Sequence, residues 1–572
     1  MDPSLSVDGV VRHTLKIGVI SSVTAHLVKV NLAHAGDVSG HYTESNRYGR
    51  GEVGELVLIE GQQCIILGRI IEVNLPDKDR NEISQDFDGL KKVDAIGFIQ
   101  MLGSINSINL KVQAGISAYP RLGDRVFSAP SELISRLPEL TNEGLDSEVK
   151  NSVKLELGVT SGDTGCKISV TPEKLFGRHC AILGSTGGGK SWTTAKIIQE
   201  CRRYKSKVIL LDATGEYRST TGGNVSHYHL GTPLHKADGS VEIRIPPTNF
   251  NESDFIALFE PSGKVQGPKL REAIKSLRLA RLAPDFATDG VFLKIRQPKE
   301  NYYAALKKDR NSTLIDDPSQ PFDIRLLIKQ IEQECCYPDD SKKPKHWGNE
   351  SGELAYCASL LTRIMGVRFA KSLECIFTSN DMLPSLVEQM EKFVEGDKSI
   401  MRICLSSIGY EFNAREVIAN AIGRILLTKA RNEAFKVKPL VVILDEAHNF
   451  LGKKIGSEDI STKLDAFELI AKEGRKYGLT ICLATQRPRD ITEGVLSQMG
   501  TLLVHRLTND RDREVVERAC GEIDRSAAAF LPNLKQGEVA LVGVDFPIPV
   551  TIQIDKPAQP PMSDGPSYQN LW

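Results

Sequence analysis

The sequence has no long hydrophobic run. In 572 residues no apolar stretch approaches the ~20 residues that cross a bilayer, and Met1 to Val11 lacks the form of a signal peptide. The hydrophobic content of 41% and the charged content of 25% are those of ordinary globular proteins, and the length predicts two or three domains. We therefore expect a cytoplasmic protein that makes no contact with a membrane.

The sequence also lacks an excess of charge and a metal-binding cysteine pattern. The formal net charge is −1, so basic residues that bind nucleic acid would have to be confined to one channel or face. The 11 cysteines are scattered without a Cys-x-x-Cys pair, which argues against zinc and for a reducing compartment. The carboxylates show no recognisable nuclease motif.

A glycine-rich loop at residues 184–191 carries the strongest functional signal. Its sequence, GSTGGGKS, follows the apolar run 180–183 and precedes a segment compatible with a helix, as in a phosphate-binding loop. Glycines let backbone N–H groups point at phosphates, and the N-terminus of the following helix adds a positive dipole. We expect Lys190 to reach the β- and γ-phosphates and Ser191 to supply an oxygen to Mg²⁺. This context disfavours the alternative of a glycine-rich turn without a ligand. The predicted ATP-binding residues are Gly184, Gly187, Gly188, Gly189, Lys190, Ser191 and Trp192.

Two adjacent carboxylates follow a second apolar run. The segment 438–444 has the character of a buried strand and leads into Asp445 and Glu446. In a parallel sheet such a strand end faces the phosphate loop. We expect Asp445 to hold Mg²⁺ through water and Glu446 to orient and polarise the attacking water. The alternative, a helix cap, is disfavoured by the presence of the phosphate loop in the same chain.

A third apolar run, 479–485, ends at a polar amide. Gln486 follows this predicted strand, where it can sense the γ-phosphate of a bound nucleotide. Arg475 lies on the short connection before the strand and can protrude towards a neighbouring subunit, and its planar, permanently charged guanidinium matches phosphate oxygens. A solvated surface arginine is the alternative, and the spacing alone does not decide between the two.

With these motifs the chain resembles the HerA family of hexameric DNA-translocating ATPases, in its bacterial form, within the HerA–FtsK branch of P-loop motors. The matching segments follow the family's order within about residues 1–560, and they are 178–191, 212–217, 445–448, 475–478 and 485–488. The resemblance implies that Arg475 and Arg178 complete the ATP site of a neighbouring subunit. The family usually has Asp-Pro-His-Gly-Glu-Tyr where this chain has Asp-Ala-Thr-Gly-Glu-Tyr from Asp212, so any role of that histidine is absent here.

We expect an α/β fold with a RecA-like P-loop ATPase core, a small N-terminal β-barrel and an inserted helical subdomain. Short alternating runs predict the barrel, and the resemblance implies the barrel that caps one face of HerA rings. The scarcity of aromatics in its strands disfavours an oligonucleotide-binding barrel. Two apolar stripes predict helix packing in the insertion, one of Leu270, Ala273, Ile274 and Leu277, the other of Leu354, Cys357, Ala358, Leu361 and Met365. The expected boundaries are 1–150 for the barrel, 151–250 and 398–555 for the core, 251–397 for the insertion and 556–572 for a C-terminal tail.

Two further segments are candidates for contacts outside the chain. The loop 452–458 is basic at Lys453 and Lys454 and follows the carboxylate-bearing strand, so it is a candidate grip on the DNA backbone, with a charged surface loop as the alternative. The tail is rich in proline and polar residues and predicts either a frayed end or an arm anchored on the adjacent subunit by Trp572.

The leading functional hypothesis is an ATP-driven ring motor on double-stranded DNA. The resemblance implies a homo-hexamer that works with a separately encoded NurA-like nuclease, or with a Sir2-like or nuclease effector, in DNA end processing or phage defence. A membrane-tethered pump of the conjugation type is disfavoured because no spanning segment is present. The alternative from a different class is a nucleotide-gated hexameric scaffold that switches an effector and moves little DNA.

Overall fold

The chain folds as two compact units. The computed structural model describes residues 10–32, 41–43, 46–62, 64–75, 95–143, 153–161, 165–317, 320–377, 382–451, 454–456, 461–520 and 525–562. The first unit is formed by Met1–Tyr204 and Thr480–Pro561, and the second by Lys205–Leu479 and Met562–Trp572. In the part of the chain described, no helix combines the length and the apolar character that spanning a membrane requires.

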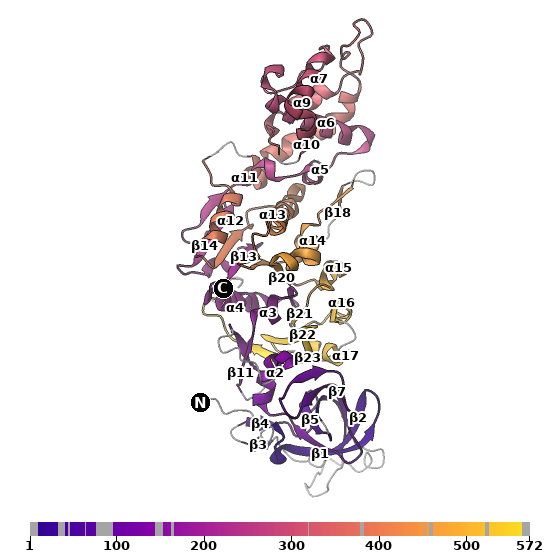
Figure 1. The fold of residues 1–572 in the computed structure, drawn as a ribbon, viewed down its shortest axis with the longest axis vertical. Helices are drawn as coiled ribbons and strands as arrows, with labels where there is room; N and C mark the ends of the chain where they lie inside the picture. Colours follow the sequence, from indigo (N-terminus) through magenta and orange to yellow (C-terminus); the bar gives the residue numbers. More distant parts are fainter. Residues whose placement is uncertain are drawn as a thin grey trace, which may run out of the picture. The chain divides into compact units, whose positions relative to one another are not determined.

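A closed six-stranded barrel begins the first unit (Figure 1). Its strands pair in the order β1–β2–β7–β6–β5–β9 and return to β1. In β2 the buried Val28 and Val30 alternate with the exposed Lys29 and Asn31, so one face of the strand is apolar and points inward. The predicted N-terminal barrel is therefore confirmed. The strands are β1 (Lys16–Val23), β2 (Leu27–Leu32), β5 (Leu56–Glu60), β6 (Cys64–Asn74), β7 (Ala95–Asn106) and β9 (Arg125–Ser128), with β8 (Val112–Ala114) paired to β7 and a separate pair of β3 (His41–Thr43) and β4 (Asn46–Tyr48).

The rest of the first unit is an α/β layer whose central strand leads into the glycine-rich loop. The strands follow the order β11-β10-β23-β22-β21-β12-β20, and β12 is parallel to both of its neighbours. All four residues of β12 are buried, as expected of a strand covered on both faces. The strands are β10 (Leu155–Thr160), β11 (Lys167–Val170), β12 (Cys180–Leu183), β20 (Leu479–Thr485), β21 (Thr501–Val504), β22 (Glu538–Gly543) and β23 (Phe546–Ile554). The helices are α2 (Ser131–Glu143), α3 (Pro172–Phe176), α4 (Lys190–Arg202), α15 (Glu493–Leu496), α16 (Asp510–Cys520) and α17 (Arg525–Phe530).

A buried arginine joins the barrel to this layer. The Arg69 guanidinium in β6 donates to the carbonyl of Pro549 in β23 at 2.8 Å and lies 5.6 Å from the centre of the Phe530 ring. Because Arg69 is only 5% exposed, the hydrogen bond and the cation–π contact are both sheltered from water, where each is stronger than at a surface.

The second unit contains a parallel sheet. The strands follow the order β17-β13-β16-β14-β15, and the pairings of β13 with β16 and β17 and of β14 with β15 and β16 are all parallel. They are β13 (Lys207–Asp212), β14 (Val225–Leu230), β15 (Val241–Ile243), β16 (Ile400–Cys404) and β17 (Leu440–Leu444). This unit also holds the hairpin of β18 (Lys454–Gly456) and β19 (Ser461–Lys463), and the helices α13 (Ala414–Arg431) and α14 (Ala466–Glu473).

The sequence between β15 and β16 forms the predicted helical insertion. In Figure 1 its helices α6, α7, α9 and α10 gather into one group. The stripe predicted in α6 is buried, which confirms its packing role. The stripe predicted in α10 is only partly correct: Cys357 is buried, but Met365 is 52% exposed and Ala358 is exposed, and the other buried residues are Leu360, Ile364 and Val367. The helices are α5 (Glu252–Phe259), α6 (Gly263–Leu282), α7 (Lys299–Lys307), α8 (Asn311–Leu314), α9 (Leu327–Glu334), α10 (Glu353–Phe369), α11 (Glu374–Phe377) and α12 (Leu386–Glu395).

Candidate functional site

The glycine-rich loop connects the carboxyl end of β12 to the first residue of α4. Gly187 and Gly189 have φ angles of +77° and +110°, in the left-handed region where a side chain would be strained. A Cβ added at Gly187 would meet no atom of the described chain within 4 Å, so the loop is open there, whereas one at Gly184 would lie 2.5 Å from the Cβ of His505. The glycines are therefore needed for two reasons. Gly187 and Gly189 adopt left-handed backbone conformations, and Gly184 lets the backbone approach His505 closely.

The start of α4 presents the predicted phosphate-binding residues in order. Gly189 is the N-cap, Lys190 is the first helical residue and is 7% exposed, and Ser191 and Trp192 follow as half-buried residues. The N-terminus of a helix favours an anion because its dipole and its first N–H groups point outward. The open Gly187 turn, the buried ammonium of Lys190 and this helix terminus together fit a bound triphosphate.

Gln486 lies directly against the loop. Leu183 of β12 is in register with Thr485 of β20, so the residues that follow these two strands emerge at the same edge of the sheet. The Thr186 hydroxyl donates to the Oε1 atom of Gln486 at 2.5 Å. The amide that was predicted to sense the γ-phosphate is thus tied to the phosphate loop, through a threonine that the sequence reasoning did not single out.

In the second unit, Asp445 follows β17 and is held by two hydroxyl groups. Its carboxylate is 5% exposed, and the Thr214 hydroxyl donates to Oδ2 at 3.3 Å while the Tyr217 hydroxyl donates to Oδ1 at 3.4 Å. Thr214 stands where the HerA pattern has histidine, so the departure from that pattern places a hydroxyl donor on the carboxylate. The oxygen donors of Asp445 and Ser191 are of the kind that Mg²⁺ prefers.

Asp212 organises the turn that carries Thr214 and Tyr217. The fully buried carboxylate accepts the backbone N–H of Gly215 at 2.7 Å and of Tyr217 at 3.1 Å. The Arg402 guanidinium of β16, itself 2% exposed, donates from Nε to the same carboxylate at 2.7 Å. Asp212 therefore acts through the turn that it stabilises, and Arg402 is a partner that no sequence motif signalled.

Glu446 has an unusual backbone conformation. Its φ angle is +49°, which is uncommon for a residue with a side chain and recurs at functional sites. It occupies the N-cap position of the short 3-10 helix Ala447–Asn449, but its side chain makes no capping hydrogen bond, which disfavours the helix-cap alternative for Glu446. Its carboxylate, 13% exposed, lies with Oε2 at 3.3 Å from Nδ1 of His448. A strained, nearly buried carboxylate beside an imidazole is compatible with a group that orients water.

The two arginines predicted to act on a neighbouring subunit precede strands. Arg178 lies two residues before β12, at the end opposite the phosphate loop, and is 45% exposed with Nε at 3.6 Å from Asp545. Arg475 is exposed in the 3-10 helix Gly474–Tyr477 before β20, whereas Gln486 follows the other end of that strand. That these arginines complete the ATP site of a neighbouring subunit stays a prediction.

The two segments predicted to make outside contacts are described in part. Of the loop 452–458, residues 454–456 form β18, and Lys453 lies outside the described residues. Residues 563–572, with Trp572, also lie outside them.

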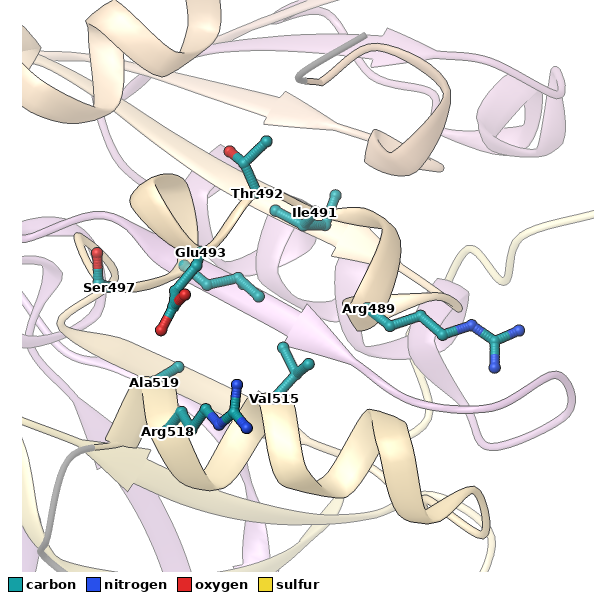
Figure 2. A pocket seen from close by; sticks show the side chains of 9 residues that line it. Arg489, Ile491, Thr492, Glu493, Ser497, Val515, Arg518 and Ala519 are labelled. Atoms are coloured by element: carbon teal, nitrogen blue, oxygen red, sulfur yellow. The ribbon is translucent and has the colours of Figure 1, made fainter.

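A cavity of about 330 Å³ lies between α15 and α16 of the first unit (Figure 2). Ile491, Leu496 and Val515 supply apolar lining, and Glu493 and Arg518 come from the two helices. None of the residues that line it belongs to the predicted site, so this cavity is not the predicted nucleotide pocket.

A buried histidine of β14, the strand paired with the one that carries Arg402, predicts acid sensitivity. His229 of β14 is 2% exposed, with Nδ1 at 2.8 Å from the Ser240 hydroxyl, and burial followed by the positive charges of Lys236 and Arg402 lowers its pKa from 6.5 to about 4. The imidazole of His229 binds a proton more readily in the unfolded chain than in the folded one. Its contribution to the free energy of unfolding is therefore fully present above about pH 6.5 and is lost towards pH 4, by up to about 3 kcal/mol.

The His229→Asn variant keeps an amide near the position of Nδ1 but does not titrate. We expect its melting temperature to fall less than that of the wild type between pH 7 and pH 4. The exposed His235→Asn change is the control and should leave the wild-type pH dependence unaltered. Parallel curves for all three proteins would contradict the assignment.

The strand–loop–helix element on parallel strands, together with the parallel sheet whose strand end carries Asp445 and Glu446, defines a RecA-like P-loop ATPase fold.

Comparison with known proteins identifies the relatives of this chain. Residues 155–325 match the family described as the central domain of the helicase HerA. A probable helicase of Methanocaldococcus jannaschii is 24% identical over 530 residues, which cover 88% of this chain and 86% of that protein. The DNA double-strand break repair helicase HerA of Sulfurisphaera tokodaii is 24% identical over 479 residues, 82% of each chain. The solved structure of the bacterial conjugative coupling protein TrwB, at 12% identity, covers 75% of this chain and 94% of its own with a TM-score of 0.42. The chain is similar to HerA helicases along most of its length, which confirms the resemblance that its motifs indicate.

Proposed function

We propose that the protein is an ATP-driven motor that acts as a homo-hexameric ring on double-stranded DNA in the cytoplasm. The observation that carries the proposal is the phosphate loop with Gln486 hydrogen-bonded to it through Thr186. A group tied to the loop in this way responds to the presence of the γ-phosphate, as a motor requires. The likeness to a relative named as a DNA double-strand break repair helicase supports DNA as the substrate.

In the proposed reaction each residue has a separate task. The ammonium of Lys190 neutralises charge on the β- and γ-phosphates, and Glu446 orients and polarises the attacking water. Ser191 would supply an oxygen ligand to Mg²⁺ and Asp445 would hold the ion through water; the ion, when bound, neutralises phosphate charge. The Thr214 and Tyr217 hydroxyls make long hydrogen bonds to the Asp445 carboxylate and so help to orient it.

A ring is needed because an arginine of one subunit completes the ATP site of the next. We assign this task to Arg475, with Arg178 as a second contributor, because a guanidinium delivered by another subunit neutralises charge that develops on the transferred phosphoryl group. Hydrolysis in one subunit then depends on the position of the next, which couples the chemistry to movement.

We propose that DNA is held by its backbone, through Lys453 and Lys454 after the carboxylate-bearing strand, without reading of the bases. Cleavage is assigned to a partner, since the sequence has no nuclease motif. The partner is a separately encoded NurA-like nuclease, or a Sir2-like or nuclease effector, in DNA end processing or phage defence.

The experiment that tests the proposal measures ATP hydrolysis by the purified assembly with and without linear duplex DNA. We expect DNA to stimulate hydrolysis severalfold, because a motor couples turnover to the translocated strand. The Lys190→Ala variant is the negative control and should show no ATP hydrolysis with or without DNA. Hydrolysis indifferent to DNA would contradict the motor and favour the nucleotide-gated scaffold, in which a partner protein rather than DNA alters turnover.

A further inference from the structure

A buried histidine lies beneath the phosphate loop and belongs to none of its motifs. His505 follows β21, whose last residue, Val504, is in register with Leu183 at the end of β12. The backbone N–H of His505 donates to the carbonyl of Leu183 at 2.7 Å. The residue is fully buried, so its imidazole occupies the interior at the point where the loop begins.

The His505 side chain lies close to both ends of the loop. Its Nε2 atom is 2.9 Å from the hydroxyl of Thr193, a fully buried residue in the first turn of α4, three positions after Lys190. Cβ atoms added at Gly184, Gly188 and Gly189 would lie 2.5, 3.4 and 3.2 Å from atoms of the His505 side chain. The ring therefore fills the space under the loop and is joined to the helix that follows it.

Two backbone contacts hold the outer side of the same loop. The N–H of Ser185 donates to the carbonyl of Arg506 at 3.1 Å, and the N–H of Gly537 donates to the carbonyl of Gly188 at 3.2 Å. Both partners flank β21 or β22, the strands next to His505 in the sheet. The loop is thus contacted by His505 and Arg506 after β21 and by Gly537 just before β22.

We propose that His505 is a positioning residue for nucleotide binding, which through Thr193 fixes the first turn of α4 and with it Lys190 and Ser191. The inference rests on the proposed nucleotide site and assigns to it a residue outside its motifs. Residues that orient a binding group from behind it can matter as much as the group itself, and a misplacement of about 1 Å can cost an enzyme on the order of 100-fold in rate.

The imidazole performs this task as a neutral group. Burial, followed by the positive charge of Lys190, lowers the pKa of His505 to about 3. A neutral imidazole offers one donor and one acceptor nitrogen and places no second cation beside Lys190. Glutamine can keep a hydrogen bond to Thr193 without the ring, whereas alanine removes both the bond and the volume.

The test compares nucleotide affinity with stability in matched variants. His505→Ala, His505→Gln and Thr193→Val probe the contact, and the double variant Thr193→Val with His505→Ala probes its coupling. His179→Ala is the control, because His179 is also a buried histidine, 2% exposed, which accepts the backbone N–H of Ile481 at 3.0 Å at the other end of β12. The dissociation constant for ATPγS is measured by calorimetry, and the melting temperature is measured without nucleotide.

We expect His505→Ala to raise the dissociation constant for ATPγS by about 10- to 100-fold and His505→Gln to restore most of the affinity. The double variant should bind no more weakly than His505→Ala alone, because both changes remove the same contact. His179→Ala should lower the melting temperature with a change in affinity of less than about twofold.

Unchanged affinity in His505→Ala, or an equal loss in His179→Ala, would overturn the inference while leaving the nucleotide site intact. Failure of the wild type to bind ATPγS would contradict the proposed function as well, so the two failures are distinguishable. If His505→Ala does not fold, the affinities of His505→Gln and Thr193→Val decide, and wild-type affinity in Thr193→Val would overturn the role of the contact.

Discussion

Replacement of Glu446 by glutamine is expected to leave ATP bound while hydrolysis slows at least about 100-fold. General-base assistance contributes about 10²- to 10⁴-fold to such reactions, and an amide of the same shape cannot polarise water in the same way. The structure supports this assignment, because Glu446 lies two residues after the end of β17 and has a strained φ of +49° and a carboxylate that is 13% exposed. The measurement is single-turnover hydrolysis at saturating ATP, with the dissociation constant for ATP determined separately.

The control for this prediction is Glu433→Gln in the same unit. Glu433 also has a left-handed backbone, with φ of +64°, but its side chain is 62% exposed and pairs with Lys436 on the surface. Its replacement should leave both binding and hydrolysis at wild-type values. Turnover of the Glu446→Gln variant within tenfold of the wild type would remove Glu446 as the water-orienting group.

Arg402→Met is expected to lower the free energy of unfolding by about 3–5 kcal/mol. Loss of one partner from a buried ion pair leaves the other charge uncompensated, and here the pair is almost completely buried, at 2% and 0% exposed. The unpaired Asp212 would still accept N–H groups from Gly215 and Tyr217, so the turn would survive with a charge that has lost its cation. Urea denaturation monitored by circular dichroism measures the effect.

Two further variants separate burial from charge in this prediction. Arg431→Met removes an ion pair with Glu473 in which the arginine is 52% exposed, and it should cost less than about 1 kcal/mol. Adding Asp212→Asn to Arg402→Met removes the unpaired charge and should recover part of the lost stability. A single Arg402→Met variant as stable as the surface variant would show that the buried pair is not required for folding.

The phosphate loop could be predicted because its chemistry is local. The residues from Gly184 to Ser191 form one uninterrupted segment that leads into α4, so a short pattern identifies them even though distant residues support the loop. The strand before Asp445 and the alternating barrel strands were predictable for the same reason, since burial imposes a repeat along each segment.

The α10 stripe was predicted less well, because its burial depends on contacts outside the helix. That helix carries apolar side chains on more than one face, and periodicity alone does not determine which face a neighbour covers. In the insertion, other segments pack against Leu360 and Ile364 and leave Met365 exposed. Which face is covered therefore depends on residues outside this helix.

The sequence alone predicts the phosphate loop and the carboxylates of Asp445 and Glu446, because each of these motifs lies in a short segment, and the resemblance that the motifs carry indicates the class of fold. The tertiary structure alone decided which distant residues support them. Thr193 and His505 are 312 positions apart, and Asp212 and Arg402 are 190 apart, yet each pair is in hydrogen-bond contact. Parallel strands bring such residues together through register between chain segments, and register depends on the whole sheet rather than on any local pattern.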